Sequence, residues 1–315
     1  MAHTPPTSIV DSPATGILLK IGSVLAFIVM SSLIKATADD IPAGESVFFR
    51  SAFALPVIVV WLAWRRELGI GFSVANPMGH VFRGVVGTMA MGLSFAGLGL
   101  LPLPELTAIS YATPLLVVVF AAMFLGEEVR LFRLSCVALG LAGVLVVLSP
   151  RLNSPLGASD QEALGAIIVL MAALCAALAQ VFIRKLVKTE RTSAIVFWFS
   201  ITSSALALVT IPFGWVMPNP TQAAFLIASG LLGGLGQILL TSSYRFADAS
   251  IVAPFDYASM IFALGIGYFI FDEVPSVIML AGACLIITAG VLIIWREQKL
   301  GLQRSRQRRA QTPQG

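Results

Sequence analysis

The sequence predicts an all-α integral membrane protein with ten transmembrane helices. Of its 315 residues, 57% are hydrophobic and only 11% are charged, and the mean hydropathy is +0.92. A soluble domain is excluded, because a water-facing surface needs roughly a quarter of its residues charged. A helix crosses the hydrocarbon core with about 20 mostly apolar residues. Such windows lie at 17–36, 45–64, 81–100, 104–124, 132–149, 163–184, 193–212, 222–244, 250–271 and 276–295. They are continuously apolar and lack the alternation of β-barrel strands.

The distribution of basic residues predicts that both termini are cytoplasmic. If residues 1–16 form a cytoplasmic tail, only Lys35 and Arg151 of the 20 Lys and Arg residues fall in outer loops. Arg50 falls within a span, and all the others lie in inner loops or tails, where such residues normally accumulate. The basic segment 296–315 has no interleaved aromatic residues. We therefore expect it to be a cytoplasmic tail beside anionic lipid rather than a binder of nucleic acid.

An internal repeat divides the chain into two halves. The segment ELTAISYATPLLVVVFAAMFLGEEV, from Glu105, resembles IVAPFDYASMIFALGIGYFIFDEV, from Ile251, and aligns Tyr111 with Tyr257. Two five-helix repeats are predicted, at 17–149 and 162–295, joined by a linker at 150–161. Because five is odd, the second repeat enters the membrane from the opposite side. Inverted repeats of this kind share a binding site near the bilayer midplane.

Several short motifs accompany the ten-span plan and the repeat: VFFRS at 47–51, the loops GEEVR at 126–130 and DEVPS at 272–276, and a span ending in AGV after each loop. Together these features resemble the EamA family of the drug/metabolite transporter superfamily. The resemblance covers about 16–296. It implies a metabolite carrier in a bacterial inner membrane, with a central cavity between the repeats. HVFRG at 80–84 and APFDYASM at 253–260 are most similar to the branch with bacterial riboflavin and S-adenosylmethionine transporters.

Two charged residues lie deep in the predicted spans. A guanidinium at the depth of Arg50 costs on the order of 3 kcal/mol unless it is compensated. Arg50 either extends back to the headgroups or faces the cavity, where it holds an anionic or electron-rich part of the substrate. Asp256 is a proton carrier, a hydrogen-bond acceptor for the substrate, or one half of a structural salt bridge. Pairing of Arg50 with Asp256 would neutralise both.

Uncharged candidates complete the predicted cavity. Tyr111 and Tyr257 lie too deep for residues of the interfacial belt, and as repeat partners they could clamp an aromatic ring from opposite sides. Gln237 on the eighth span and Gln180 on the sixth are hydrogen-bonding groups for a heterocycle or for another helix. Glycine-rich faces permit a homodimer without requiring one.

No motif predicts an enzyme, a metal site or a cofactor. The sequence has no Gly-x-x-x-x-Gly-Lys-Ser/Thr loop, its three cysteines are far apart, and so are His3 and His80. An intramembrane enzyme acting on lipid would need an acid pair or metal ligands. We expect a secondary transporter that moves a flat or zwitterionic metabolite by alternating access, with riboflavin uptake as the leading hypothesis. Transport of S-adenosylmethionine, amino acids or drugs, and a channel distinguished by its lack of saturation and counterflow, are the alternatives.

Overall fold

A computed structural model describes residues 13–66, 68, 72, 74–125, 131–152, 160–186, 189–246 and 253–311. The described residues form helices and connecting turns without any strand. Part of the predicted linker, 153–159, and most of the N-terminal tail lie outside them. The helices are α1 (Pro13–Lys35), α2 (Ala43–Ala52), α3 (Ala54–Trp64), α5 (Pro77–Leu98), α6 (Leu103–Ser110), α7 (Ala112–Leu125), α8 (Leu131–Leu152), α9 (Asp160–Leu186), α10 (Thr192–Leu208), η1 (Ile211–Phe213), α11 (Pro220–Phe246), η2 (Ala253–Tyr257), α13 (Ala258–Phe271) and α14 (Val277–Gln311).

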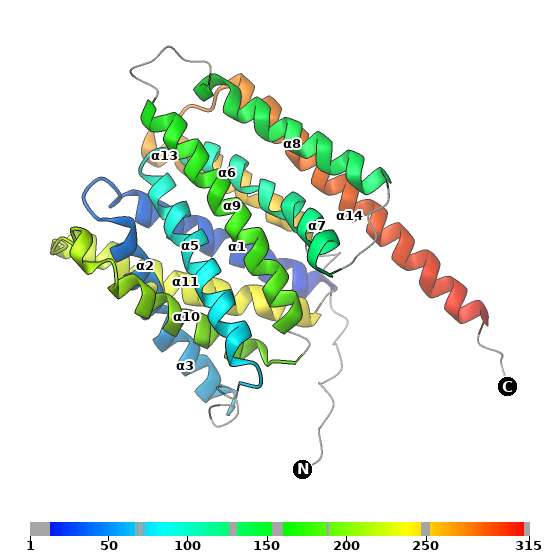
Figure 1. The fold of residues 1–315 in the computed structure, drawn as a ribbon, viewed down its shortest axis with the longest axis horizontal. Coiled ribbons are helices and arrows are strands. Elements are labelled where there is room, and N and C mark those ends of the chain that lie inside the picture. Colours follow the sequence, from blue (N-terminus) through cyan, green and yellow to red (C-terminus); the bar gives the residue numbers. More distant parts are fainter. Residues whose placement is uncertain are drawn as a thin grey trace.

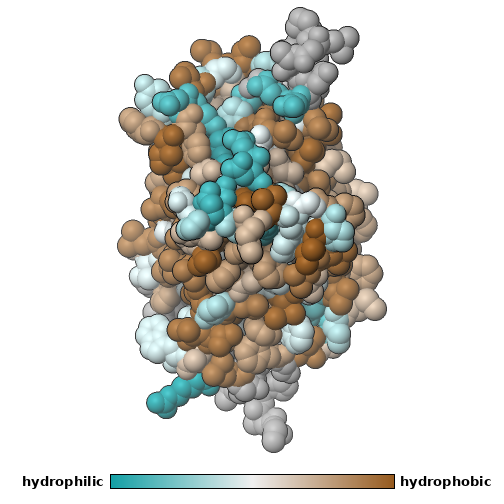
Figure 2. Space-filling view, turned by 90° about the vertical axis from the view of Figure 1, so that its left-hand side faces the viewer, coloured by the Kyte–Doolittle hydropathy of each residue, from teal (hydrophilic) through white to brown (hydrophobic). Residues whose placement is uncertain are grey.

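In the described residues each of the ten apolar windows falls mainly on helix, and seven helical segments are long and apolar enough to cross a membrane. The remaining windows coincide with shorter apolar helices at 134–150, 193–208 and 255–271. Large hydrophobic side chains are exposed along many of these helices. Figure 2 shows one face of the molecule, largely hydrophobic with a group of hydrophilic residues in its upper half. The chain is thus an all-helical, multi-pass membrane protein, and the count of ten spans remains a prediction.

Three of the predicted continuous spans are interrupted in the structure. The second is divided at Phe53 into α2 and α3, the fourth at Tyr111 into α6 and α7, and the ninth at Tyr257 into η2 and α13. Pro56 and Pro114 explain the first two breaks, because proline lacks an N–H and its ring clashes with the carbonyl four residues earlier. The freed backbone groups are tolerated where the break is buried in protein.

The helices pack in pairs that join the two halves of the sequence. α1 lies along α11, α5 along α9, and α8 along α14 (Figure 1). α10 packs against α2, α3 and α5, and α11 against α2 and α3. The main hydrophobic core, which includes Ile34, Leu103, Ile109, Leu115 and Ile286, lies where the broken α6 and α7 meet their neighbours.

Glycines set a close helix crossing between α8 and α14. A Cβ atom on Gly143 of α8 would lie 2.9 Å from the Gly282 carbonyl oxygen of α14, and one on Gly282 would lie 2.7 Å from the Gly143 oxygen. Neither distance accommodates a side chain, so these backbones touch as small residues allow in membrane helices. Gly230 and Gly234 of α11 pack in the same way against the α2–α3 break, where a Cβ atom on either would meet Phe53 or Val57.

Candidate functional site

Two arginines share one aromatic ring inside the helix bundle. Arg50 comes from α2, Arg83 from α5 and Phe199 from α10, which packs against both. The Cζ atom of Arg83 lies 3.8 Å from the centroid of the Phe199 ring and that of Arg50 lies 5.8 Å from it. Arg50 is buried, with 4% of its surface exposed. We call Arg50 and Arg83 the arginine pair.

The arginine pair lacks polar partners in the described part of the chain. Nε of Arg50 and both Nε and Nη1 of Arg83 are buried without a hydrogen bond. The ion pairs among the described residues involve other groups. The hydroxyl oxygens of Ser46 and Ser51, which flank Arg50 on α2, are also buried and unbonded. This region therefore holds a concentration of unused hydrogen-bond donors.

Glycines leave space for the two guanidinium groups at the middle of the bundle. A Cβ atom on Gly87, near the centre of α5, would collide with Nη1 of Arg83. A Cβ atom on Gly233, near the centre of α11, would lie 3.1 Å from Nε of Arg50. Gln237 stands one turn from Gly233 on α11 and is partly buried, whereas Gln180 is exposed on α9. Among the described residues, no hydrogen bond joins Gln180 to the arginine pair.

A second polar group contains the predicted tyrosines. The rings of Tyr111 and Tyr257 meet edge to face, with centroids 5.1 Å apart and planes at 73°. The Tyr111 hydroxyl contacts the Ser259 hydroxyl and donates to the backbone oxygen of Tyr257 (3.3 Å), and Ser259 donates to the backbone oxygen of Asp256 (2.7 Å). We call Tyr111, Tyr257 and Ser259 the tyrosine group. Because the two rings touch, they do not clamp a substrate ring between them, and that expectation is wrong in this conformation.

Asp256 pairs with a lysine that the sequence analysis assigned to an inner loop. Nζ of Lys20 lies 2.7 Å from Oδ1 of Asp256, and the side chain of Lys20 is 3% exposed whereas that of Asp256 is 51% exposed. The predicted pairing of Arg50 with Asp256 is therefore wrong. Lys20 lies inside the first apolar window, and Asp256 lies inside the ninth. A basic residue in one span and a lone acid in another were the sequence signal for this ion pair. An ammonium buried on α1 needs such a partner.

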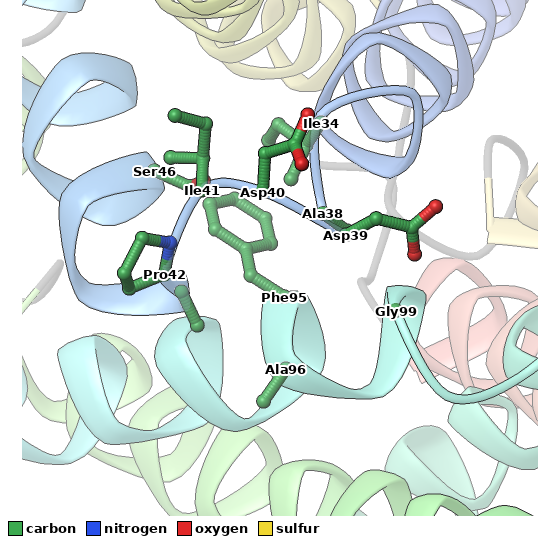
Figure 3. Close-up of a pocket in the computed structure, with 11 residues that line it drawn as sticks. Ile34, Ala38, Asp39, Asp40, Ile41, Pro42, Ser46, Phe95, Ala96 and Gly99 are labelled. Atoms are coloured by element: carbon green, nitrogen blue, oxygen red, sulfur yellow. The ribbon is translucent and has the colours of Figure 1, made fainter. Parts of the chain in front are cut away.

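A cavity of about 270 Å³ opens where the loop after α1 meets α2 and α5. Figure 3 shows Phe95 extending from α5 beneath the loop that carries Asp39 and Asp40. Ser46 also lines it. Since residues four apart share a helix face, Ser46 lies directly above Arg50 on α2. The same two helices thus line the cavity and carry the arginine pair.

Ion pairs fasten the helices at the cavity end of the bundle. Lys35, at the end of α1, lies 3.0 Å from Oε1 of Glu273 and donates to the backbone oxygens of Leu98 and Leu101. The other oxygen of Glu273 accepts from the Leu103 N–H at 2.8 Å, so this carboxylate caps α6. A carboxylate is stabilised at a helix N-terminus. We call Lys35 and Glu273 the Lys35–Glu273 latch, because it joins the two halves of the chain.

A second carboxylate holds the opposite end of α5. Oε1 of Glu190 accepts from the Ala75 and Asn76 N–H groups at 2.7 and 2.6 Å. His80 Nε2 lies 3.7 Å from the other oxygen of Glu190. Both ends of the helix that carries Arg83 are thus fixed by side chains from elsewhere in the chain.

The geometry is that of a multi-pass membrane protein with charged side chains inside a bundle that contains broken helices. Residues 14–149 and 163–295 match the model of the EamA-like transporter family. The chain belongs to this family and is a membrane transporter rather than an enzyme.

The relatives of the chain are named for different substrates. A pseudopaline exporter of Pseudomonas aeruginosa is 30% identical over 90% of this chain and 98% of its own. An S-adenosylmethionine uptake transporter of Rickettsia bellii is 27% identical, covering 85% of this chain and 92% of its own. A riboflavin transporter of Rhizobium johnstonii is 26% identical, covering 93% and 96%. A solved protein structure at 19% identity matches 92% of this chain and 99% of its own with a TM-score of 0.65, which supports the fold.

Arg83 and Phe199 were missed by the sequence analysis. Arg83 was counted among the inner basic residues because it lies near the start of its apolar window. Its side chain extends toward Gly87, deeper in the bundle, where it meets Phe199. Phe199 is one of 20 phenylalanines, and only the packing of α10 on α2 and α5 distinguishes it.

Proposed function

We propose that the chain is a secondary transporter, which moves a small organic metabolite across the inner membrane by alternating access. The observation that carries this proposal is the arginine pair with Phe199, a mid-bundle site built from both halves of the chain. Charged residues at membrane depth face a substrate path by default. Interrupted helices beside such a site are typical of secondary transporters.

The packing pattern supports an inverted repeat with two halves at 17–149 and 162–295. When the halves are exchanged, the contact of α1 with α11 becomes that of α9 with α5, and both contacts are extensive. In the same way, the contact of α2 with α11 becomes that of α10 with α5. This exchange is expected of two repeats related by a pseudo-two-fold axis. We place both termini in the cytoplasm, from the distribution of basic residues.

Alternating access requires that one side be closed while the other opens. We assign the Lys35–Glu273 latch to closure on the outer side, because it joins α1 and α6 of the first half to the segment after α13. We assign the contact of Glu190 with the start of α5 to the inner side. The substrate site lies between these two sets of contacts.

Riboflavin is a second, more specific candidate. The Rhizobium johnstonii relative named as a riboflavin transporter covers 93% of this chain. Direct contact between Tyr111 and Tyr257 removes the clamp that first favoured a flavin. A flavin would instead have to stack on another ring, and Phe199 is available beside the arginine pair.

Counterflow in proteoliposomes tests the transport proposal. Purified protein would be reconstituted and loaded with unlabelled riboflavin or S-adenosylmethionine, and entry of the labelled compound would be followed. A carrier gives saturable entry that is accelerated by the internal compound. Loss of that entry in R50M, with retention in R296Q, is expected if the mid-bundle site binds the substrate. Conduction without saturation or counterflow would replace the carrier with a channel.

A further inference from the structure

We infer that the arginine pair is a binding site for an oxyanion, a carboxylate or phosphate group carried by the transported substrate. This inference rests on the proposed transport function and narrows its substrate class. It starts from the buried Arg50 and the partly buried Arg83, whose buried nitrogen atoms find no counter-charge in the described part of the protein.

The arginine pair is electrostatically unbalanced. A guanidinium stays protonated in proteins, so two like charges lie beside the same Phe199 ring, with their Cζ atoms 3.8 and 5.8 Å from its centroid. Phe199 offers its ring to both, but a cation–π contact supplies no hydrogen-bond acceptor. Buried charges are normally paired and hydrogen-bonded. The missing component is therefore an anion with several acceptor atoms.

Four acids of the helix bundle are engaged elsewhere among the described residues. Glu45, one turn and a half from Arg50 on α2, accepts from the Val216 N–H at 3.1 Å. Glu190 accepts two N–H groups at the start of α5, and Glu273 is paired with Lys35. Asp256 is paired with Lys20. Among the described residues no acid is thus left for the arginine pair, and we assign its counter-charge to a ligand.

The chemistry of the unused donors specifies the ligand. A planar guanidinium binds a carboxylate or phosphate through two parallel hydrogen bonds, which a halide cannot accept in the same way. The Nε atoms of both arginines are free for such bonds, and the unbonded hydroxyl groups of Ser46 and Ser51 lie on the same helix as Arg50. Gly87 and Gly233 leave the room that the two guanidinium groups occupy, because a Cβ atom on either glycine would approach a guanidinium nitrogen.

Thermal unfolding of the purified full-length chain tests this site without transport. Melting temperatures would be compared in sodium succinate, sodium phosphate and sodium chloride at equal ionic strength. We expect succinate, phosphate or both to raise the melting temperature by about 3 °C over chloride, because a ligand of the folded state stabilises it. The salt that acts identifies the oxyanion. R50M and R83M should lose this rise, and R50K should keep part of it.

R296Q is the matched control, because Arg296 also contacts a ring, with its Cζ 5.4 Å from the centroid of Phe132, but lies on the exposed surface. It should respond like the wild type. An equal rise in the wild type, R50M and R83M, or no rise with either salt, would overturn the site. Repeating the assay in nanodiscs separates lipid from solute: a rise that needs phosphatidylglycerol and neither salt would assign a headgroup and overturn a substrate site.

The outcomes are separable from those of the transport assay. A protein that shows the oxyanion response but no counterflow retains the site and refutes the transporter proposal. If the wild type transports, and R50M and R83M both transport normally and melt like the wild type in every salt, the transport function stands and the oxyanion site is refuted.

Discussion

At the scale of single residues, the charges buried in this chain fall into two kinds. Lys20 and Asp256 satisfy each other at 2.7 Å, whereas Arg50 and Arg83 meet only an aromatic ring. Paired charges are expected to contribute to the stability of the fold. Unpaired ones reduce it and are retained where a ligand needs them.

The Lys20–Asp256 pair gives the first prediction. D256N leaves the buried ammonium of Lys20 without a counter-charge, so the free energy of unfolding should fall by about 2 kcal/mol, less than for a fully buried pair because Asp256 is half exposed. The double variant K20M/D256N should recover most of this loss. Melting temperatures of the purified variants measure both effects. If D256N and the wild type melt together, the pair contributes nothing to stability.

The arginine pair gives the opposite prediction. In chloride alone, R83M should melt no lower than the wild type, because the substitution removes an uncompensated charge and keeps an apolar stem of similar length. The same variant should lose counterflow. Differential scanning fluorimetry and the proteoliposome assay measure the two properties. A large fall in melting temperature would mean that Arg83 is part of the structural core.

At the scale of the elements, small residues and prolines determine where helices touch and where they break. Gly143 and Gly282 bring α8 and α14 into backbone contact, and Pro56 and Pro114 interrupt two spans. Both effects depend on residue types that leave little trace in hydropathy. The apolar windows therefore identified where helices lie but gave three of them as continuous.

Substitution at the glycine crossing provides a test at this scale. G282A places a methyl group 2.7 Å from the Gly143 oxygen and 2.6 Å from Val147 Cγ2, so α8 and α14 must separate. We expect a loss of about 1–3 kcal/mol in the free energy of unfolding, as for other overpacked sites. G265A is the control, because a Cβ on Gly265 meets no atom within 4 Å. Equal melting temperatures for the two variants would contradict the tight crossing.

At the scale of the whole molecule, the fold class and the family could be predicted from sequence, and most of the site chemistry could not. The fold class and the family could be predicted from long apolar runs and from the motifs VFFRS, GEEVR and DEVPS. These features are local, because each is read from a short continuous stretch of sequence. Side-chain pairing is not local. The partner of Asp256 lies on the first helix, and the ring beside Arg50 lies on the seventh predicted span. Only packing brings such residues together.

The Lys35–Glu273 latch gives a prediction for the whole molecule. E273Q removes the charge that pairs with Lys35, so the cavity end should open more often. A cysteine at Ser51, in a chain whose three native cysteines are replaced by alanine, would report this opening. Its maleimide labelling in purified protein should become several-fold faster in E273Q. D272N, a change at the exposed neighbouring residue, should leave the rate unchanged. Equal labelling rates with and without E273Q would show that the Lys35–Glu273 latch does not control opening of the cavity end.

The glycine crossing of α8 and α14 also bears on how the proposed halves could move. Where the side chains of two helices interlock, one helix can slide along the other only by moving its side chains over a ridge of the other's side chains. At Gly143 and Gly282 the backbones meet without side chains between them. Sliding would drive each chain into the larger residues that flank its glycine, whereas rotation about the contact leaves it intact. We therefore propose that this crossing is the pivot about which the two halves would rock, and that it resists sliding of α8 along α14.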